Sequence, residues 1–187
     1  MEDEVEFRMF PKIPRLNRNM VITEKIDGTN GCIVILDDGS VMAQSRNRFV
    51  TSSADNQGFA KWVEANKEKL VELLGPGYHY GEWWGSGIQC GYGLTKGEKF
   101  FSLFNDARWS GIDFSAVPGL GVVPVLWRGP FDTAKIASTL TLLGAMGSIA
   151  MPGYPKPEGI VIWHEHARQL FKVTLDNDEV PKSLVRG

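Results

Sequence analysis

Glycine and proline interrupt this chain along its whole length. They account for 21 and 10 of its 187 residues, and no internal repeat is present. Because both residues end regular structure, each helix or strand must be short. The stretches between these interruptions predict strands or hairpins over 31–45, 78–84, 99–106, 122–128 and 158–175, and helices over 56–75 and 131–144.

The two hairpins and the first helix have the clearest patterns. Residues 31–45 place two arms rich in β-forming side chains around an Asp-Asp-Gly turn, and 158–175 turns near His166. Apolar residues recur at helical spacing in 56–75, which ends at Gly75-Pro76. Many strands and two helices, in no strict β-α-β order, predict an α+β fold with largely antiparallel sheets flanked by helices.

Length and charge narrow the class of protein. A chain of 187 residues suits one well-buried domain, and 43% hydrophobic with 22% charged residues is typical of a globular protein. The net charge is -2, whereas nucleic-acid binders are usually basic. Any polynucleotide surface must therefore be local. Two groups of basic residues are candidates: Arg8, Lys12, Arg15 and Arg18, and then Arg46 and Arg48.

The cysteines and the N-terminus bear on the compartment. Cys32 lies in an apolar alternating run and reads as a small buried hydrophobe, and Cys90 is the only other cysteine. Two cysteines make no disulfide scaffold. The acidic N-terminus has no signal-peptide pattern, and no run of about 18 apolar residues exists. We expect a soluble cytosolic protein without membrane contact.

Three charged residues occupy unusual positions. Lys25 stands in TEKIDGTNG, beside what reads as a tight turn, and is by itself most simply a solvated lysine. Glu82 lies inside the aromatic run YHYGEWWG, where a carboxylate needs a partner or a ligand. Lys172 is centred in the apolar run QLFKVTL, so it points either to water or to a polar site.

Taken in order, six motifs resemble those of the covalent nucleotidyltransferase superfamily, which contains ATP-dependent DNA and RNA ligases and mRNA-capping guanylyltransferases. They are KIDG from Lys25, SRNR, YGEW, FFSLFND, PEGIVIW and LFKVT. The chain looks most like the RNA ligase 2 type of nick-sealing RNA ligase, from about Pro11 to Asn177. EKIDGTN and YGEWWGSGIQ are the most specific marks of that branch.

The resemblance implies a ligase-type nucleotidyltransferase (ATP-grasp-like) domain that uses ATP with Mg²⁺, or Mn²⁺ in its place. Lys25 would form a phosphoramidate with AMP, and a nearby cation and desolvation favour the neutral amine that this attack requires. Lys172 would assist catalysis at the α-phosphate, and Glu158 would hold or orient the metal. The implied nucleotide-binding set is Glu24, Asn30, Arg46, Glu82, Phe104, Glu158 and Lys172.

Individual roles in nucleotide binding follow from motif positions. Glu82 matches the carboxylate that accepts hydrogen bonds from ribose hydroxyls, and Phe104 matches the aromatic that stacks on adenine. Arg46 matches the phosphate-binding arginine, with Arg48 as the substitute if the register shifts by two. Asn30 corresponds to a polar residue near the transferred phosphate. The expected outcome is the sealing of 5′-phosphate and 3′-hydroxyl RNA ends.

The chain departs from the family pattern at two motifs. Thr174 stands where a second lysine is usual, and Lys182 and Lys156 are the candidates for supplying the missing charge. In SLFND the carboxylate position is shifted, because Asn105 follows Phe104 directly.

The chain also ends ten residues after Asn177. We expect residues 1–187 to form a single adenylyltransferase domain without the C-terminal accessory domain of its relatives. Its partners would be the ends of a nucleic acid, either at a nick in RNA, in a single strand of RNA, or in DNA. An accessory protein would be a further partner. A phage or bacterial host cytosol is the expected setting.

Four other interpretations compete with this one. A DNA nick ligase or a capping guanylyltransferase belongs to the same superfamily, and GTP use would identify the latter. A nucleotide-binding module that lost catalysis with Thr174 would bind ATP without forming covalent AMP. A zinc site would use His164 and His166, which we expect on one side of a strand, but no third ligand cluster stands nearby.

Overall fold

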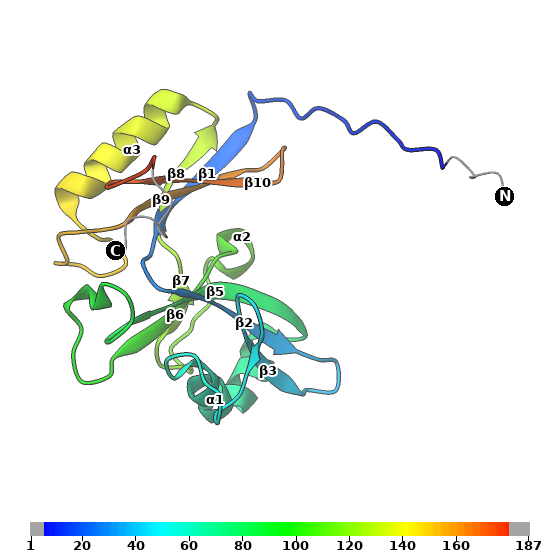
Figure 1. Cartoon of the computed structure of the whole chain (residues 1–187), viewed down its shortest axis with the longest axis vertical. Coiled ribbons are helices and arrows are strands. Elements are labelled where there is room, and N and C mark those ends of the chain that lie inside the picture. The colour runs from blue at the N-terminus through cyan, green and yellow to red at the C-terminus, as the bar shows by residue number, and fades with distance from the viewer. Residues whose placement is uncertain (1–5, 180–187) are drawn as a thin grey trace.

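Two β-sheets, one above the other in Figure 1, carry the fold. This computed structural model describes residues 6–179. The chain passes from the four-stranded sheet to the six-stranded sheet after β1 and returns after β7. Residues 6–15 extend away from the body as an arm. The prediction of an α+β fold with largely antiparallel sheets is confirmed.

The four-stranded sheet is antiparallel throughout, in the order β10-β9-β1-β8. Its strands are β1 (Asn19–Lys25), β8 (Val125–Pro130), β9 (Gly159–His164) and β10 (Gln169–Thr174). Alternate residues of β1 and β9, Met20 and Ile22 with Ile160 and Ile162, form a core against α3 (Thr133–Met146). Side chains alternate across a strand, so Lys25 lies on the face away from α3.

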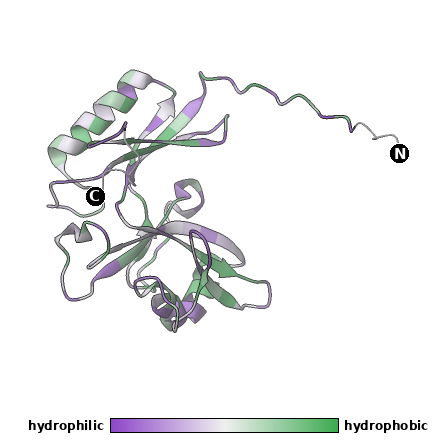
Figure 2. Cartoon of the chain, in the orientation of Figure 1, coloured by the Kyte–Doolittle hydropathy of each residue, from purple (hydrophilic) through white to green (hydrophobic). Residues whose placement is uncertain are grey.

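The six-stranded sheet has the order β4-β3-β2-β5-β6-β7, and only its β6–β7 pair is parallel. Its strands are β2 (Thr29–Ile35), β3 (Val41–Ser45), β4 (Phe49–Val50), β5 (Gly77–Gly85), β6 (Lys99–Leu103) and β7 (Leu120–Val122). The helix α1 (Phe59–Leu74) covers one face, where Phe59, Trp83 and Phe101 are buried. Strands β2 and β3 are mostly hydrophobic in Figure 2. The predicted hairpins and the first helix are confirmed.

The predicted strand over 122–128 is wrong as a single element. Its first part is β7 in the six-stranded sheet, and its second part is β8 in the other. Pro124 lies between them and has no N–H for a ladder, while its carbonyl accepts a hydrogen bond from the Glu24 amide at 3.0 Å. The break is therefore where the chain changes sheets.

The end of the second helix also differs from the prediction. Gly144 does not stop α3, which continues to Met146 and ends at Gly147, whose φ is 85°. At Gly144 the helix lies against Leu175, and a Cβ would come within 3.0 Å of that side chain. The glycine therefore serves packing within the helix, and Gly147 supplies the backbone conformation that ends it.

Sequence patterns missed β1, the short β4, the 3₁₀ turn Gly91–Gly93 and the short helix α2 (Asp106–Trp109). The expectation that His164 and His166 share a strand face is wrong, because β9 ends at His164 and His166 lies in the turn. His164 is buried and its Nε2 is 2.7 Å from the Leu16 carbonyl oxygen. Within residues 6–179, no helix combines the length and apolar character needed to cross a bilayer.

Candidate active site

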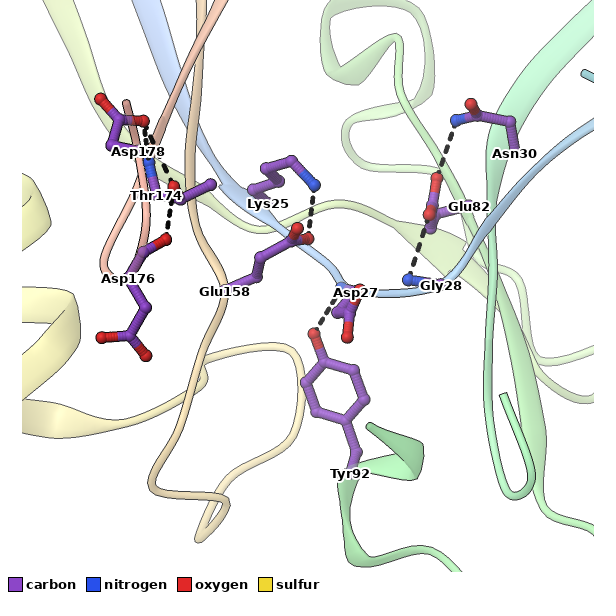
Figure 3. Close-up of polar contacts among 10 residues, drawn as sticks. All are labelled: Lys25, Asp27, Gly28, Asn30, Glu82, Tyr92, Glu158, Thr174, Asp176 and Asp178. Atoms are coloured by element: carbon purple, nitrogen blue, oxygen red, sulfur yellow. Dashed lines mark hydrogen bonds and ion pairs between the residues drawn. The ribbon is translucent and has the colours of Figure 1, made fainter. Parts of the chain in front are cut away.

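The crossover from β1 to β2 carries the lysine singled out in the sequence. Lys25 is the last residue of β1, and residues 26–28 lead into β2. Ile26 is buried in a cluster with Trp84, Tyr92 and Val123, which lies between the two sheets. The Asp27 N–H donates to the Tyr92 hydroxyl at 2.7 Å (Figure 3). Both contacts fix the backbone next to Lys25.

Lys25 forms an ion pair with Glu158 (Figure 3). Lys25 lies opposite Gly159 in the β1–β9 ladder, so the residue just before β9 is brought to its amine. The two side chains are 19% and 10% exposed, which leaves the pair largely shielded from water. Gly159 has φ of 154°, and a Cβ there would come within 2.2 Å of the Val173 carbonyl oxygen. Glycine is therefore required beside Glu158.

Glu82 occupies the other side of the crossover, on β5. It accepts hydrogen bonds from the Gly28 N–H at 3.1 Å and from Asn30 Nδ2 at 3.0 Å. Asn30 lies directly opposite Glu82 in the β2–β5 ladder, which explains the contact. Burial raises the pKa of the Glu82 carboxyl to about 7, and the positive charge of Lys25 opposes that rise.

Gly28 lets the crossover approach β5 closely. A Cβ at this position would lie 2.5 Å from the Trp83 carbonyl oxygen and 2.9 Å from Glu82 Cγ. In the structure, the crowded neighbour of Gly28 is the β5 strand, and this contact places the Gly28 N–H on Glu82.

The Glu24 side chain points away from Lys25, because side chains alternate between the two faces along β1. Glu24 is 1% exposed and accepts hydrogen bonds from the Ser148 hydroxyl at 2.6 Å and from the Ile149 and Ala150 N–H groups, each at 2.8 Å. Its carboxylate thus ties the end of β1 to the loop after α3. The structure does not bring the Glu24 side chain together with Lys25, Glu82 and Glu158.

The remaining predicted residues lie on other strands or just after them. Lys172 is exposed on β10, opposite Val161, which is opposite Thr23 in β1. This register puts Lys172 on the same face of the sheet as Lys25. Arg46 is exposed in the turn after β3, and Phe104 is 42% exposed just after β6.

The two departures from the family pattern have local structural roles. The Thr174 hydroxyl donates to the Asp176 carbonyl oxygen at 2.9 Å, and its N–H donates to Asp178 Oδ1 at 2.8 Å. Asn105 caps α2 by accepting from the Arg108 N–H at 3.2 Å. Asp106 forms an ion pair with Arg128 of β8, so it connects the two sheets.

Of the two proposed replacements for the missing lysine, the structure describes one. Lys156 is exposed in the loop before Glu158. Lys182 lies outside the described residues.

Sequence reasoning missed Tyr92, whose hydroxyl holds the crossover, and Ser148, which holds Glu24. Tyr92 had one signal, an aromatic residue between two glycines in the loop after β5. Ser148 had none, because its partner is 124 residues away.

Hollows and acidic clusters do not mark a second centre. Two hollows of about 640 and 520 Å³ lie away from Lys25, one beside Trp127 and Phe131 and one between α2 and β8. In the part of the chain that the structure describes, no group of three or more histidine, cysteine or acidic side chains is arranged to hold a metal ion. The contacts of Lys25 with Glu158, and of Glu82 with Gly28 and Asn30, define the candidate site.

One protein family and a group of solved structures are similar to this chain. The profile of the RNA ligase family, described as "RNA ligase", matches residues 18–174. No curated protein sequence matches the chain. Among solved structures, three mutants of the Naegleria gruberi RNA ligase are similar in fold.

The first of these mutants, without ligand, has a TM-score of 0.63 and 18% identity, covering 85% of this chain and 50% of the other. A second mutant, with ATP and Mn, has a TM-score of 0.65 and 20% identity, and the match covers 86% of this chain and 51% of the other. A third mutant, with AMP and Mn, has a TM-score of 0.62 and 19% identity, and the match covers 85% of this chain and 50% of the other.

This chain spans about half the length of those structures. At such low identity, the structural similarity establishes the shared fold alone. The profile match covers most of the chain and contains Lys25, Glu82, Glu158 and Lys172. The chain therefore belongs to the RNA ligase family.

Proposed function

We propose that this chain is an ATP-dependent RNA ligase, or its adenylyltransferase domain, and that Lys25 carries the nucleotide. The observation that supports it most is the Lys25 amine, held by Glu158 and within the field of Glu82 at the crossover between the sheets. The similar Naegleria gruberi structures with ATP and Mn, or AMP and Mn, support the choice of nucleotide and of a divalent ion.

In the first step, the neutral Lys25 amine attacks the α-phosphorus of ATP. An N–P bond forms, the bond between the α-phosphorus and the oxygen leading to the β-phosphorus breaks, and pyrophosphate leaves with that electron pair. The ammonium form of Lys25 gives up one proton to become the neutral amine, and Glu158, already in contact with Nζ, is the adjacent acceptor. A second proton leaves the nitrogen when the N–P bond forms. Lys172, on the same face, would offset charge on the α-phosphate.

Two further transfers complete the joining. A 5′-phosphate oxygen takes AMP from Lys25, which returns the amine. A 3′-hydroxyl then attacks the adenylylated phosphate, forms the phosphodiester and releases AMP. Both steps use the same face of the four-stranded sheet, where Lys25 and Lys172 lie.

The donor set fits a divalent cation of the Mg²⁺ type. Mg²⁺ usually binds through one or two carboxylates together with phosphate oxygens and water, and Glu158 provides a carboxylate next to the nucleophile. When bound, the ion would add positive charge that favours the neutral amine and stabilises the phosphate oxygens. Glu158 would then exchange its contact with Lys25 for one with the metal.

The nucleotide contacts remain part of the proposal. Glu82 would accept a hydrogen bond from a ribose hydroxyl, and Asn30, its partner on β2, would face the transferred phosphate. Phe104 has an exposed ring for stacking on adenine, and Arg46 is exposed for a phosphate. For Glu24 we propose nucleotide contact only through its backbone, because protein donors occupy its carboxylate.

The substrate and partners are proposed at the level of the family. RNA ends with a 5′-phosphate and a 3′-hydroxyl, at a nick or in a single strand, would be joined in the cytosol, where ATP and RNA are both present. We propose that residues 1–187 act as one adenylyltransferase domain and that an accessory domain or protein grips the rest of the RNA. The family match favours RNA ligation over the DNA ligase or a module without catalysis.

Joining assays test this function step by step. The purified protein should seal a 5′-phosphorylated RNA end with ATP and Mg²⁺, and Lys25→Ala should fail. Lys25→Ala should still join an end that is already adenylylated, because that reaction does not need the amine as nucleophile. If wild type joins neither kind of end, in RNA or in DNA, the proposed function is wrong.

A further inference from the structure

The strand that carries Glu82 also carries two exposed tyrosines on the same face. In β5, Tyr78, Tyr80 and Glu82 are spaced by two residues, so their side chains leave the same side of the sheet. The intervening His79 and the following Trp83 are buried on the side covered by α1. The tyrosines therefore extend the site face of this sheet away from Lys25.

The two rings form an open aromatic surface. Tyr78 and Tyr80 are 58% and 54% exposed, their planes are within 17° of parallel, and their centroids are 6.3 Å apart. They lie opposite Val34 and Cys32 in the β2–β5 ladder, and both of those residues are buried. The rings thus shield the strand beneath them while exposing their own surface.

The residues beside these rings in neighbouring rows of the sheet are uncharged or aromatic. Across the sheet from Tyr80, the row continues through Cys32 of β2 to Gln44 of β3. The row of Tyr78 continues through Val34 to Met42. At the other side, the Phe104 N–H donates to the Tyr80 carbonyl oxygen at 3.0 Å. Flat aromatic faces of this kind stack on nucleobases of any sequence.

We propose that Tyr78 and Tyr80 bind the unpaired bases of an RNA strand whose end is being joined at Lys25. This inference rests on the proposed function and specifies its substrate, because bases in a duplex are already stacked and paired. It is supported by the continuity of the Tyr78–Tyr80 surface with Glu82 along one strand face. The ligase would accordingly bind a single-stranded RNA end more tightly than the same end within a duplex.

Binding of a short 5′-phosphorylated single-stranded RNA tests the surface directly. Replacing both tyrosines by threonine, Tyr78→Thr with Tyr80→Thr, keeps strand-forming residues but removes the rings. The dissociation constant should rise on the order of 30-fold, the lower end expected for two lost base stacks. Replacing both by phenylalanine keeps the stacking surface, so affinity should stay within about threefold of wild type.

Controls separate stacking from other effects. Phe171→Thr removes a similarly exposed aromatic from β10, on a different sheet, and should leave RNA binding unchanged. The dependence of affinity on salt should have the same slope in wild type and in the threonine pair, because no phosphate contact is lost. Should the threonine pair fail to fold, ultraviolet cross-linking of RNA to wild type, mapped by mass spectrometry, should mark residues 78–80.

Several results would overturn the proposal. The first two are an unchanged RNA affinity in the threonine pair, and a loss of affinity in the phenylalanine pair as large as in the threonine pair. The others are a smaller salt slope in the threonine pair than in wild type, and cross-links that lie only outside residues 78–80. Light scattering that shows a wild-type dimer broken by the threonine pair would instead identify a contact between two copies. Adenylylation of wild type by ATP, measured on the same preparation, reports separately on the proposed function.

Discussion

Glu82 is a buried carboxyl whose ionisation connects stability to the site. It is 8% exposed, and burial raises the pKa of its carboxyl to about 7 from a usual 4.5. A raised pKa means that the folded protein binds a proton more tightly than the unfolded chain. The resulting stabilisation is complete below pH 4.5 and is lost as the pH rises through about 7.

Glu82→Gln should therefore become more stable relative to wild type as the pH rises. Glutamine keeps the size and an acceptor for the Gly28 N–H but cannot ionise. From pH 4.5 to 8, the free energy of unfolding of the variant should gain up to about 3 kcal/mol over wild type. Urea denaturation at both pH values measures this change.

Glu68→Gln, on the exposed side of α1, is the matched control and should show no such trend. A difference between Glu82→Gln and wild type that stays constant with pH would show that Glu82 titrates as an ordinary surface carboxyl.

At the scale of elements, the site depends on how one short crossover is held. The Glu24 carboxylate ties the end of β1 to the loop after α3, and Tyr92 in the turn Gly91–Gly93 holds the Asp27 amide. Tyr92 has φ of 52°, a left-handed conformation that non-glycine residues rarely adopt. This backbone conformation directs the hydroxyl at the crossover, so we expect the turn to position Lys25.

Tyr92→Phe tests this positioning by removing one oxygen. The ring should keep its contacts with Trp84 and Tyr154, while the Asp27 N–H loses its acceptor. A neutral hydrogen bond contributes about 0.5–1.5 kcal/mol, so lysine adenylylation at saturating ATP should slow by roughly 2- to 10-fold. A variant with lower stability but a wild-type rate would show that Tyr92 only supports the fold.

Local patterns were enough to predict some elements and not others. The hairpin over 31–45 and helix α1 follow from turn residues and apolar spacing within one segment. Strand β1 escaped prediction because five consecutive residues are buried, so it shows no alternation of polar and apolar side chains. The split between β7 and β8 depends on which sheet each strand joins, and that information is not local.

At the scale of the whole molecule, the site is assembled where the two sheets meet. Motif order along the chain predicted Lys25, Glu82 and Glu158 as one group, and the ladders β1–β9 and β2–β5 explain their proximity. The direction of the Glu24 side chain, the Tyr92 contact and the tie from Asp106 to Arg128 arise only from packing. Motif resemblance names residues, whereas sheet register decides which way each side chain points.

The proposed ligase function depends most on the Lys25 amine as nucleophile. Measuring the intact mass of the protein tests this role directly. After incubation with ATP and Mg²⁺, wild type should gain the mass of one adenylyl group, and peptide mapping should place it on Lys25. Lys172→Ala should gain it more slowly, and Lys25→Arg, which keeps the charge, should gain none. An unchanged wild-type mass, or an adenylyl group on another residue, would contradict the central claim.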